Sequence, residues 1–177
     1  GHRWVEANLA SSWFSTVQVK PNVTFSPDLP NGNATLGYEA HSESLARREG
    51  KELAVPLSGT STLTSQLAPL VRRTLPVVLP PSLAPGHETR TITIEAPKGF
   101  SVAELPPGGD EPGGDFGSAK VEVKRGTKPG VVIVKRSLIF DLSTIPVDRY
   151  SAWRGWLQRV DRLMHQTVRF VPTEAAK

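Results

Sequence analysis

The amino-acid sequence predicts a mainly β protein, organised as an antiparallel β-sandwich or two packed sheets with one long C-terminal helix. Two observations predict this fold class. Short apolar or alternating segments recur along the chain and are separated by turns rich in Gly, Pro, Asn and Asp, which is typical of antiparallel sheets. Residues 146–165 show instead the three- and four-residue apolar spacing of an amphipathic helix, the only convincing long segment of this kind.

The chain length of 177 residues suits one domain, or one domain with a smaller subdomain. We predict an N-terminal β-hairpin region at residues 1–69, within the same domain as a β-rich region at residues 70–177. The sequence begins with Gly1-His2, which resembles a remnant of cloning. We therefore expect the chain to be part of a longer protein.

Composition excludes several classes of site. The absence of cysteine excludes disulfides, zinc–thiolate sites and thiol nucleophiles. The net charge of +4 is spread along the chain without a basic run, so it does not indicate nucleic acid as a partner. No apolar stretch approaches the about 20 residues of a membrane-spanning helix, and we expect no membrane span.

The N-terminal region has the pattern of a β-hairpin. Apolar and polar side chains alternate over residues 17–25, a turn with Asn31-Gly32 at its tip follows, and residues 35–43 can return as the partner strand. Residues 44–50 are then predicted to form a short polar helical turn or a loop. A short strand at residues 52–57 and an exposed Ser/Thr-rich connection at residues 58–65 follow.

The C-terminal region contains the clearest strand pattern. Residues 88–96 place Thr91 and Thr93 on one face and Ile92 and Ile94 on the other, so one face of this strand is expected in water. An edge strand is predicted at residues 71–79 and a flexible acidic loop at residues 106–117. Four further strands are predicted at residues 100–105, 119–124, 131–140 and 167–171. The strand at residues 71–79 is assigned to an edge because it contains a proline.

The helix carries the candidate interaction surface. Its apolar stripe consists of Tyr150, Trp153, Leu157, Val160 and Met164, and we expect Trp153 to pack in the core. Trp156 lies beside this stripe, and we interpret it as an exposed contact residue. The surface predicted to bind a partner comprises Trp156, Arg149, Arg154 and Arg159.

No catalytic, cofactor or metal site is predicted. None of the four histidines has the Ser-Asp or Cys neighbours of a recognised nucleophile. His41 and Glu43 share a face of a predicted strand, but two ligands do not make a metal site. Asp110, Glu111 and Asp115 could form a calcium loop, although their spacing matches no EF-hand and a solvated loop is the favoured interpretation.

Three short motifs in the C-terminal region occur in order: Arg73-x-x-Pro76, Pro97-x-Gly99-Phe100 leading to Leu105-Pro106, and Ile145-Pro146-x-x-x-Tyr150-x-x-Trp153-Arg154. The series spans about residues 70 to 170, and it resembles the C-terminal β-rich domain of bacterial transglutaminase-like proteins. The resemblance implies a periplasmic or cell-envelope location and a transglutaminase-like domain upstream in the same chain. The Cys-His-Asp core of that family would lie in the upstream domain, and no residue here can be matched to its cysteine.

Two functions follow as hypotheses. The first is a non-catalytic accessory or interaction domain of a larger transglutaminase-like envelope protein, which positions the upstream domain or docks another envelope protein. The second is a carbohydrate- or peptidoglycan-binding module. That alternative needs two coplanar exposed aromatic rings, for which the sequence offers Trp4, Trp13, Phe14 and Tyr38.

Overall fold

The computed structural model describes residues 2–6, 17–28, 30, 32–42, 45–59 and 61–173. Within it the chain divides into two compact units, residues 1–47 and residues 48–177. The division lies earlier than the predicted boundary between residues 69 and 70. The reason is that strand β6 (Glu52–Pro56) pairs with the late strand β14 (Thr167–Pro172) and so belongs to the second unit.

The described residues of the first unit form a short helix and two two-stranded antiparallel sheets: α1 (His2–Val5), β1 (Gln18–Val19) with β4 (Ala40–His41), and β2 (Thr24–Asp28) with β3 (Asn33–Gly37). The predicted hairpin is confirmed, since Asp28 pairs with Asn33 across a turn in which Gly32 has a φ of +66°. Only glycine adopts this backbone conformation without strain. Trp13, Phe14 and Glu43, and the side chain of Trp4, lie outside the described part of the chain.

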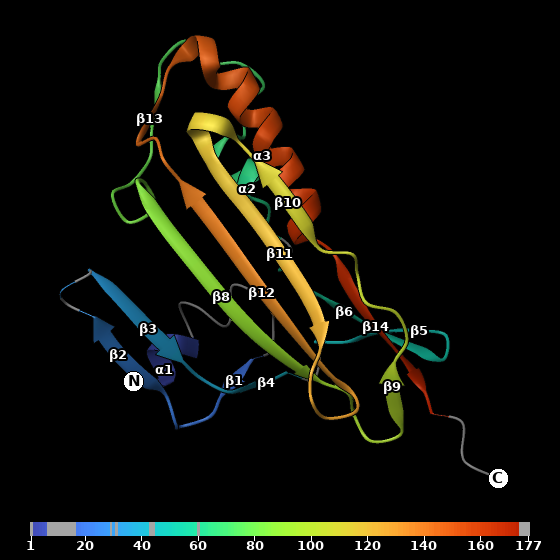
Figure 1. Ribbon diagram of the computed structural model, residues 1–177. Helices are drawn as coiled ribbons and strands as arrows, with labels where there is room; N and C mark the ends of the chain where they lie inside the picture. The colour runs from blue at the N-terminus through green and yellow to red at the C-terminus, as the bar shows by residue number, and fades with distance from the viewer. Residues whose placement is uncertain are drawn as a thin grey trace. The chain divides into compact units, whose positions relative to one another are not determined.

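The second unit contains a long four-stranded antiparallel sheet in the order β10-β11-β12-β8 (Figure 1). Its strands are β8 (Gly86–Glu95), β10 (Gly109–Pro112), β11 (Gly117–Arg125) and β12 (Val131–Phe140). The strands predicted at residues 88–96, 119–124 and 131–140 are thereby confirmed. The flexible loop predicted at residues 106–117 is wrong, because this segment forms β10 and the 3-10 helix η3 (Gly114–Phe116).

The two faces of this sheet differ as the alternation predicted. Val134 pairs with Ile92 and Val132 pairs with Ile94, so these aliphatic side chains share the inner face. Their neighbours Thr91 and Thr93 are exposed on the outer face. Because side chains alternate between faces along a strand, the outer face remains polar while the inner face supplies core.

A second four-stranded sheet has the order β5-β6-β14-β9, with β5 at Arg47–Glu49 and β9 at Phe100–Val102. Its interior side chains include Val55, Val168 and Phe170, which are 4%, 0% and 1% exposed. The strands predicted at residues 52–57 and 167–171 are confirmed. The helical turn or loop predicted at residues 44–50 is wrong over β5.

Short elements connect the sheets to the helix: α2 (Leu63–Leu67), β7 (Val77–Val78), β13 (Thr144–Ile145) and the 3-10 helix η4 (Val147–Arg149). Helix α3 (Tyr150–Met164) follows η4 directly, so the predicted helix at residues 146–165 is confirmed with small differences at its ends. The predicted exposed connection at residues 58–65 includes the start of α2. The edge strand predicted at residues 71–79 is reduced to the two residues of β7.

Helix α3 runs alongside β10 and β11 and packs against the first sheet (Figure 1). Trp153, Leu157 and Val160 are each 0% exposed, which confirms that the predicted stripe packs in the core. Burying a large apolar side chain stabilises a fold by about 1.5–3 kcal/mol. The helix therefore provides much of the core of this unit.

Asp161 of α3 caps the start of α2. Its carboxylate accepts hydrogen bonds from the backbone N–H of Leu63 at 2.7 Å, from the backbone N–H of Thr64 at 3.1 Å and from the Thr64 hydroxyl at 2.5 Å. The first N–H groups of a helix have no partner within that helix, and an acidic group there satisfies them and interacts favourably with the helix dipole. This cap holds α2, and the segment that follows it, against α3.

Candidate interaction surface

A distinctive surface feature of the described second unit is a series of exposed aliphatic side chains that begins after α2 and ends in β7. We call Leu70, Val71, Leu75 and Val78 the apolar strip. Their exposed fractions are 55%, 71%, 69% and 73%. Single exposed aliphatic residues are common on protein surfaces, but four within nine positions of the sequence make this segment the candidate contact surface of the unit.

The strip is held in place by buried neighbours on both sides of it. Ala68 is 0% exposed at its start, and Val77 and Leu79 are 8% and 2% exposed at its end. Val77 pairs with Ile145 of β13, and the Leu79 N–H donates to the Ser143 carbonyl at 2.8 Å. The exposed residues are thus carried on a segment whose ends are fixed in the core.

Helix α3 fixes the backbone of the same segment. The Tyr150 hydroxyl donates to the Leu70 carbonyl at 2.7 Å, and the Arg154 Nε donates to the Ala68 carbonyl at 3.2 Å. Pro69 and Pro76 further restrict the backbone. Because a restricted segment loses less conformational entropy on binding, this arrangement favours association.

A shallow hollow of about 360 Å³ lies beside the strip. Leu70, Arg72, Arg73, Thr74 and Leu75 line it. The hollow is thus lined by two leucines, two arginines and one threonine. A surface of this composition is suited to a protein segment that carries both apolar and acidic side chains.

The prediction that Trp156 is an exposed contact residue is wrong. Its side chain is 1% exposed, stacked on Phe116 at a centroid distance of 6.3 Å and edge-on to Phe140 at 5.7 Å. Its indole Nε1 donates to the Glu111 carbonyl of β10 at 3.3 Å. Trp156 is buried because β10 and η3 cover this side of the helix. Both elements lie in the segment that was expected to be a flexible loop.

The absence of a side chain at Gly113 allows the glycine-rich segment to pack closely on Trp156. A Cβ at Gly113 would lie 2.7 Å from the Trp156 Cε2 and 2.9 Å from the Gly117 carbonyl oxygen. We expect Gly113→Ala to lower the free energy of unfolding by about 1–3 kcal/mol, because overpacking forces neighbouring groups to move. Chemical denaturation followed by tryptophan fluorescence measures this change.

Gly155→Ala is the matched control, because a Cβ at Gly155 meets no atom within 4 Å and alanine favours a helix over glycine by about 1 kcal/mol. The control variant should therefore be more stable than the wild type. A neutral Gly113→Ala beside a stabilised Gly155→Ala would contradict the close packing of the glycine-rich segment on Trp156.

The three arginines of the predicted surface contact other elements of their own unit. The Arg149 Nη2 lies 3.2 Å from the Asp115 Oδ2, and its guanidinium carbon lies 4.6 Å from the Phe116 ring centroid. The Arg159 Nε lies 3.0 Å from the Glu111 Oε2, while Arg154 donates to Ala68 as described above. These side chains connect α3 to the glycine-rich segment and to the start of the strip.

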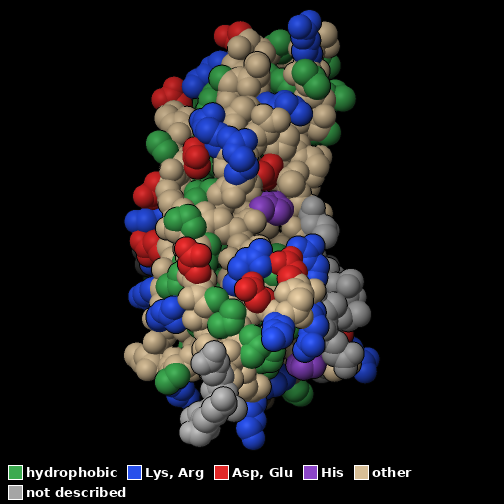
Figure 2. Space-filling model, turned by 90° about the vertical axis from the view of Figure 1, so that its right-hand side faces the viewer, with side chains coloured by type: hydrophobic (Ala, Val, Ile, Leu, Met, Phe, Trp, Pro, Cys, Tyr) green, Lys and Arg blue, Asp and Glu red, His purple; other side chains and the backbone are tan. Residues whose placement is uncertain are grey.

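Basic and acidic side chains are interspersed on the face shown in Figure 2, rather than gathered into one basic patch. The ion pairs of Arg149 and Arg159 follow this pattern, since each brings an acidic side chain beside a basic one. Exposed pairs of this kind contribute little to stability. Their effect here is to neutralise charge along α3.

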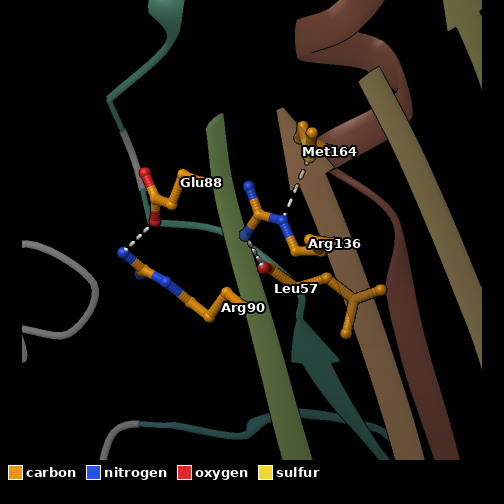
Figure 3. A network of polar contacts seen from close by, with 5 residues as sticks. All are labelled: Leu57, Glu88, Arg90, Arg136 and Met164. Atoms are coloured by element: carbon orange, nitrogen blue, oxygen red, sulfur yellow. Dashed lines mark hydrogen bonds and ion pairs between the residues drawn. The ribbon is translucent and has the colours of Figure 1, made fainter. Parts of the chain in front are cut away.

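An arginine on the inner face of the first sheet forms a separate polar network (Figure 3). The Arg136 Nη1 donates to the Leu57 carbonyl at 2.7 Å, and its Nε lies 3.0 Å from the Met164 sulfur. Burial, with a smaller effect from the charge of Arg90, lowers the pKa of Arg136 to about 10. Arg90 in turn forms an ion pair with Glu88 at 2.7 Å. The network links β12 to the end of β6 and to the end of α3.

The outer face of the sheet places a histidine beside two hydroxyl groups. The His87 Nε2 lies 3.0 Å from the Ser137 Oγ and 3.0 Å from the Thr89 Oγ1. A serine nucleophile needs a base that a third group orients, together with donors that stabilise an oxyanion. The described hydrogen bonds of His87 include no carboxylate, and all three side chains hydrogen-bond on an exposed sheet surface.

Within the described residues no group of three His, Asp or Glu side chains is placed to hold a metal ion, and no described helix has the length and apolar character needed to cross a membrane. The apolar strip was not predicted because residues 71–79 were expected to form a strand, in which alternate side chains would be buried. The available signal was Pro76 and the adjacent Arg72 and Arg73 within a largely aliphatic segment, which disfavours a regular strand.

The fold is thus a β-rich architecture of antiparallel sheets with one long C-terminal helix. Comparisons with protein-family models, curated protein sequences and solved structures gave no match.

Proposed function

We propose that this chain is a non-catalytic accessory domain of a larger transglutaminase-like envelope protein, and that it docks a protein partner through the apolar strip. The partner is the upstream domain of the same protein or another envelope protein, in the periplasm or cell envelope. The observation that carries the docking role is the exposure of 55–73% at four aliphatic side chains on a segment with buried ends. The motif series between residues 70 and 170 supports the choice of parent protein.

Burying the apolar strip offsets much of the cost of association. Burying one Leu or Val side chain contributes about 1.5–3 kcal/mol. Four such side chains supply an amount comparable with the cost of association, about 4–15 kcal/mol. The stiff backbone of the strip keeps its own ordering cost small.

The carbohydrate- or peptidoglycan-binding alternative has less support. Among the described aromatic side chains only Phe25 is exposed, at 66%, while Trp153 and Trp156 are buried. A sugar-stacking platform requires at least two exposed rings in one plane, and the described residues do not provide a pair. The docking role is therefore the function that the described surface favours.

We expect Leu75→Ser to weaken partner binding by about 10- to 100-fold, because the variant loses the burial energy of one Leu side chain. The measurement is quantitative capture of a single protein from an envelope extract by the immobilised full chain. Leu75 is 69% exposed, so the fold should be retained, which circular dichroism checks.

Phe25→Ser is the matched control, since Phe25 is 66% exposed and belongs to the first unit. This variant should capture as much partner as the wild type. Equal losses in Leu75→Ser and Phe25→Ser would contradict a docking role for the strip. Capture of glycan or peptidoglycan in place of protein would instead favour the binding-module alternative.

A further inference from the structure

The charges beside the apolar strip carry an inference about its partner, which rests on the proposed function. Arg72 and Arg73 line the hollow together with Leu70 and Leu75. No Asp or Glu occurs from residue 53 to residue 87. The strip and its surroundings in sequence therefore carry positive charge without any acidic side chain.

These two arginines differ from the arginines of α3. Arg149 and Arg159 each form an ion pair with a carboxylate of their own unit. Neither Arg72 nor Arg73 forms an ion pair or a side-chain hydrogen bond within the described part of the chain. Their guanidinium groups therefore have donors that a partner can use.

We infer that the apolar strip binds a protein segment in which acidic side chains alternate with aliphatic ones. The aliphatic side chains of the segment pack on Leu70 and Leu75, and its carboxylates accept hydrogen bonds from Arg72 and Arg73. A guanidinium binds a carboxylate through two parallel N–H···O bonds. The interaction is stronger than in open water because the adjacent aliphatic side chains exclude part of the solvent.

A protein partner fits the surroundings of the strip better than an anionic membrane does. β13 pairs with β7 at the end of the strip, and it lies between Asp141 and Asp148, both exposed. An anionic lipid surface would repel these carboxylates. A protein segment can place its acidic groups at the arginines and avoid both aspartates.

The test uses two fluorescein-labelled peptides with blocked ends, Gly-Leu-Glu-Val-Glu-Leu-Gly and its neutral counterpart with Gln in place of Glu. Fluorescence anisotropy with the full chain measures their affinities at low and high salt. We expect the acidic peptide to bind about tenfold more tightly at low salt, because charge-assisted hydrogen bonds are stronger than neutral ones. The double variant Arg72→Gln/Arg73→Gln should remove this preference, and Leu75→Ser should weaken both peptides.

Each other outcome is informative. Equal affinities for the two peptides, both weakened by Leu75→Ser, would overturn the acidic preference and leave the proposed docking function intact. Binding of neither peptide would also overturn the inference, while the capture experiment with Leu75→Ser judges the docking function separately. Tighter, arginine-dependent binding to phosphatidylglycerol vesicles than to the acidic peptide would assign the strip to a membrane and overturn it.

Discussion

Trp156→Ala is expected to lower the free energy of unfolding by about 3–5 kcal/mol, the usual effect of removing a buried Trp from a core. Trp156 is 1% exposed and contacts Phe116 and Phe140 from two directions. Its loss removes the group on which η3 and β10 pack. Urea denaturation followed by circular dichroism measures the change.

Trp156→Phe provides the comparison for this experiment. Phenylalanine keeps an aromatic ring, but it cannot donate to the Glu111 carbonyl as the Trp156 Nε1 does at 3.3 Å. The net contribution of such a hydrogen bond is about 1 kcal/mol, so the loss of stability should be smaller than in Trp156→Ala. A fully stable Trp156→Ala would contradict the placement of Trp156 beneath β10.

Trp153→Ala is the second change with a large expected effect, again a loss of about 3–5 kcal/mol in the free energy of unfolding. Trp153 is 0% exposed on the central stripe of α3, with its ring centroid 6.1 Å from that of Tyr150. Loss of this packing would also loosen Tyr150, whose hydroxyl holds Leu70. The apolar strip should therefore become more mobile, which amide hydrogen exchange at residues 70–76 detects.

The indole nitrogens of the two tryptophans make their phenylalanine variants a useful pair. The Trp153 Nε1 is buried without a hydrogen-bond partner among the described residues, whereas Trp156 donates to Glu111. Trp153→Phe removes a polar group that has no described partner, so it should cost less stability than Trp156→Phe. A near-neutral Trp153→Ala would contradict the packing of α3 on the first sheet.

Much of the fold could be predicted because the sequence patterns have local causes. The alternation of polar and apolar side chains at Thr91, Ile92 and Thr93 predicts a strand with one solvent-exposed face. The spacing of Trp153 and Leu157 predicts the buried stripe of the helix. Both patterns follow from backbone geometry alone. The division into two units was not predictable in this way, because it depends on the pairing of β6 with β14.

The error at Trp156 has a nonlocal cause. A helix that packs only on a flat sheet would leave Trp156 at the border of its buried stripe. Here the edge strand β10 accepts a hydrogen bond from the indole through the Glu111 carbonyl, and Gly113 lets the backbone approach the indole ring. A glycine-rich segment that resembles a loop in the sequence thus supplies the missing cover.

The apolar strip was not predicted because its residues were expected to lie in a regular strand. The pattern at residues 71–79 predicts a strand, which would place half of its side chains in a core. Within residues 71–79 only Val77 and Val78 form a strand, in which Val77 is buried and Val78 faces solvent. The side chains of Tyr150 and Arg154 instead hydrogen-bond to backbone carbonyls at the start of the segment. Such hydrogen bonds join residues about 80 positions apart and have no local signature in the sequence.

Photo-crosslinking from position 75 tests the docking role most directly. Leu75 is replaced by p-benzoylphenylalanine in the full protein, expressed in the cells that make it naturally, and Phe25 is replaced in the same way as the control. The proposed function predicts one protein partner crosslinked at position 75 and not at position 25. The absence of a crosslink at position 75, or the same products from both positions, would contradict it.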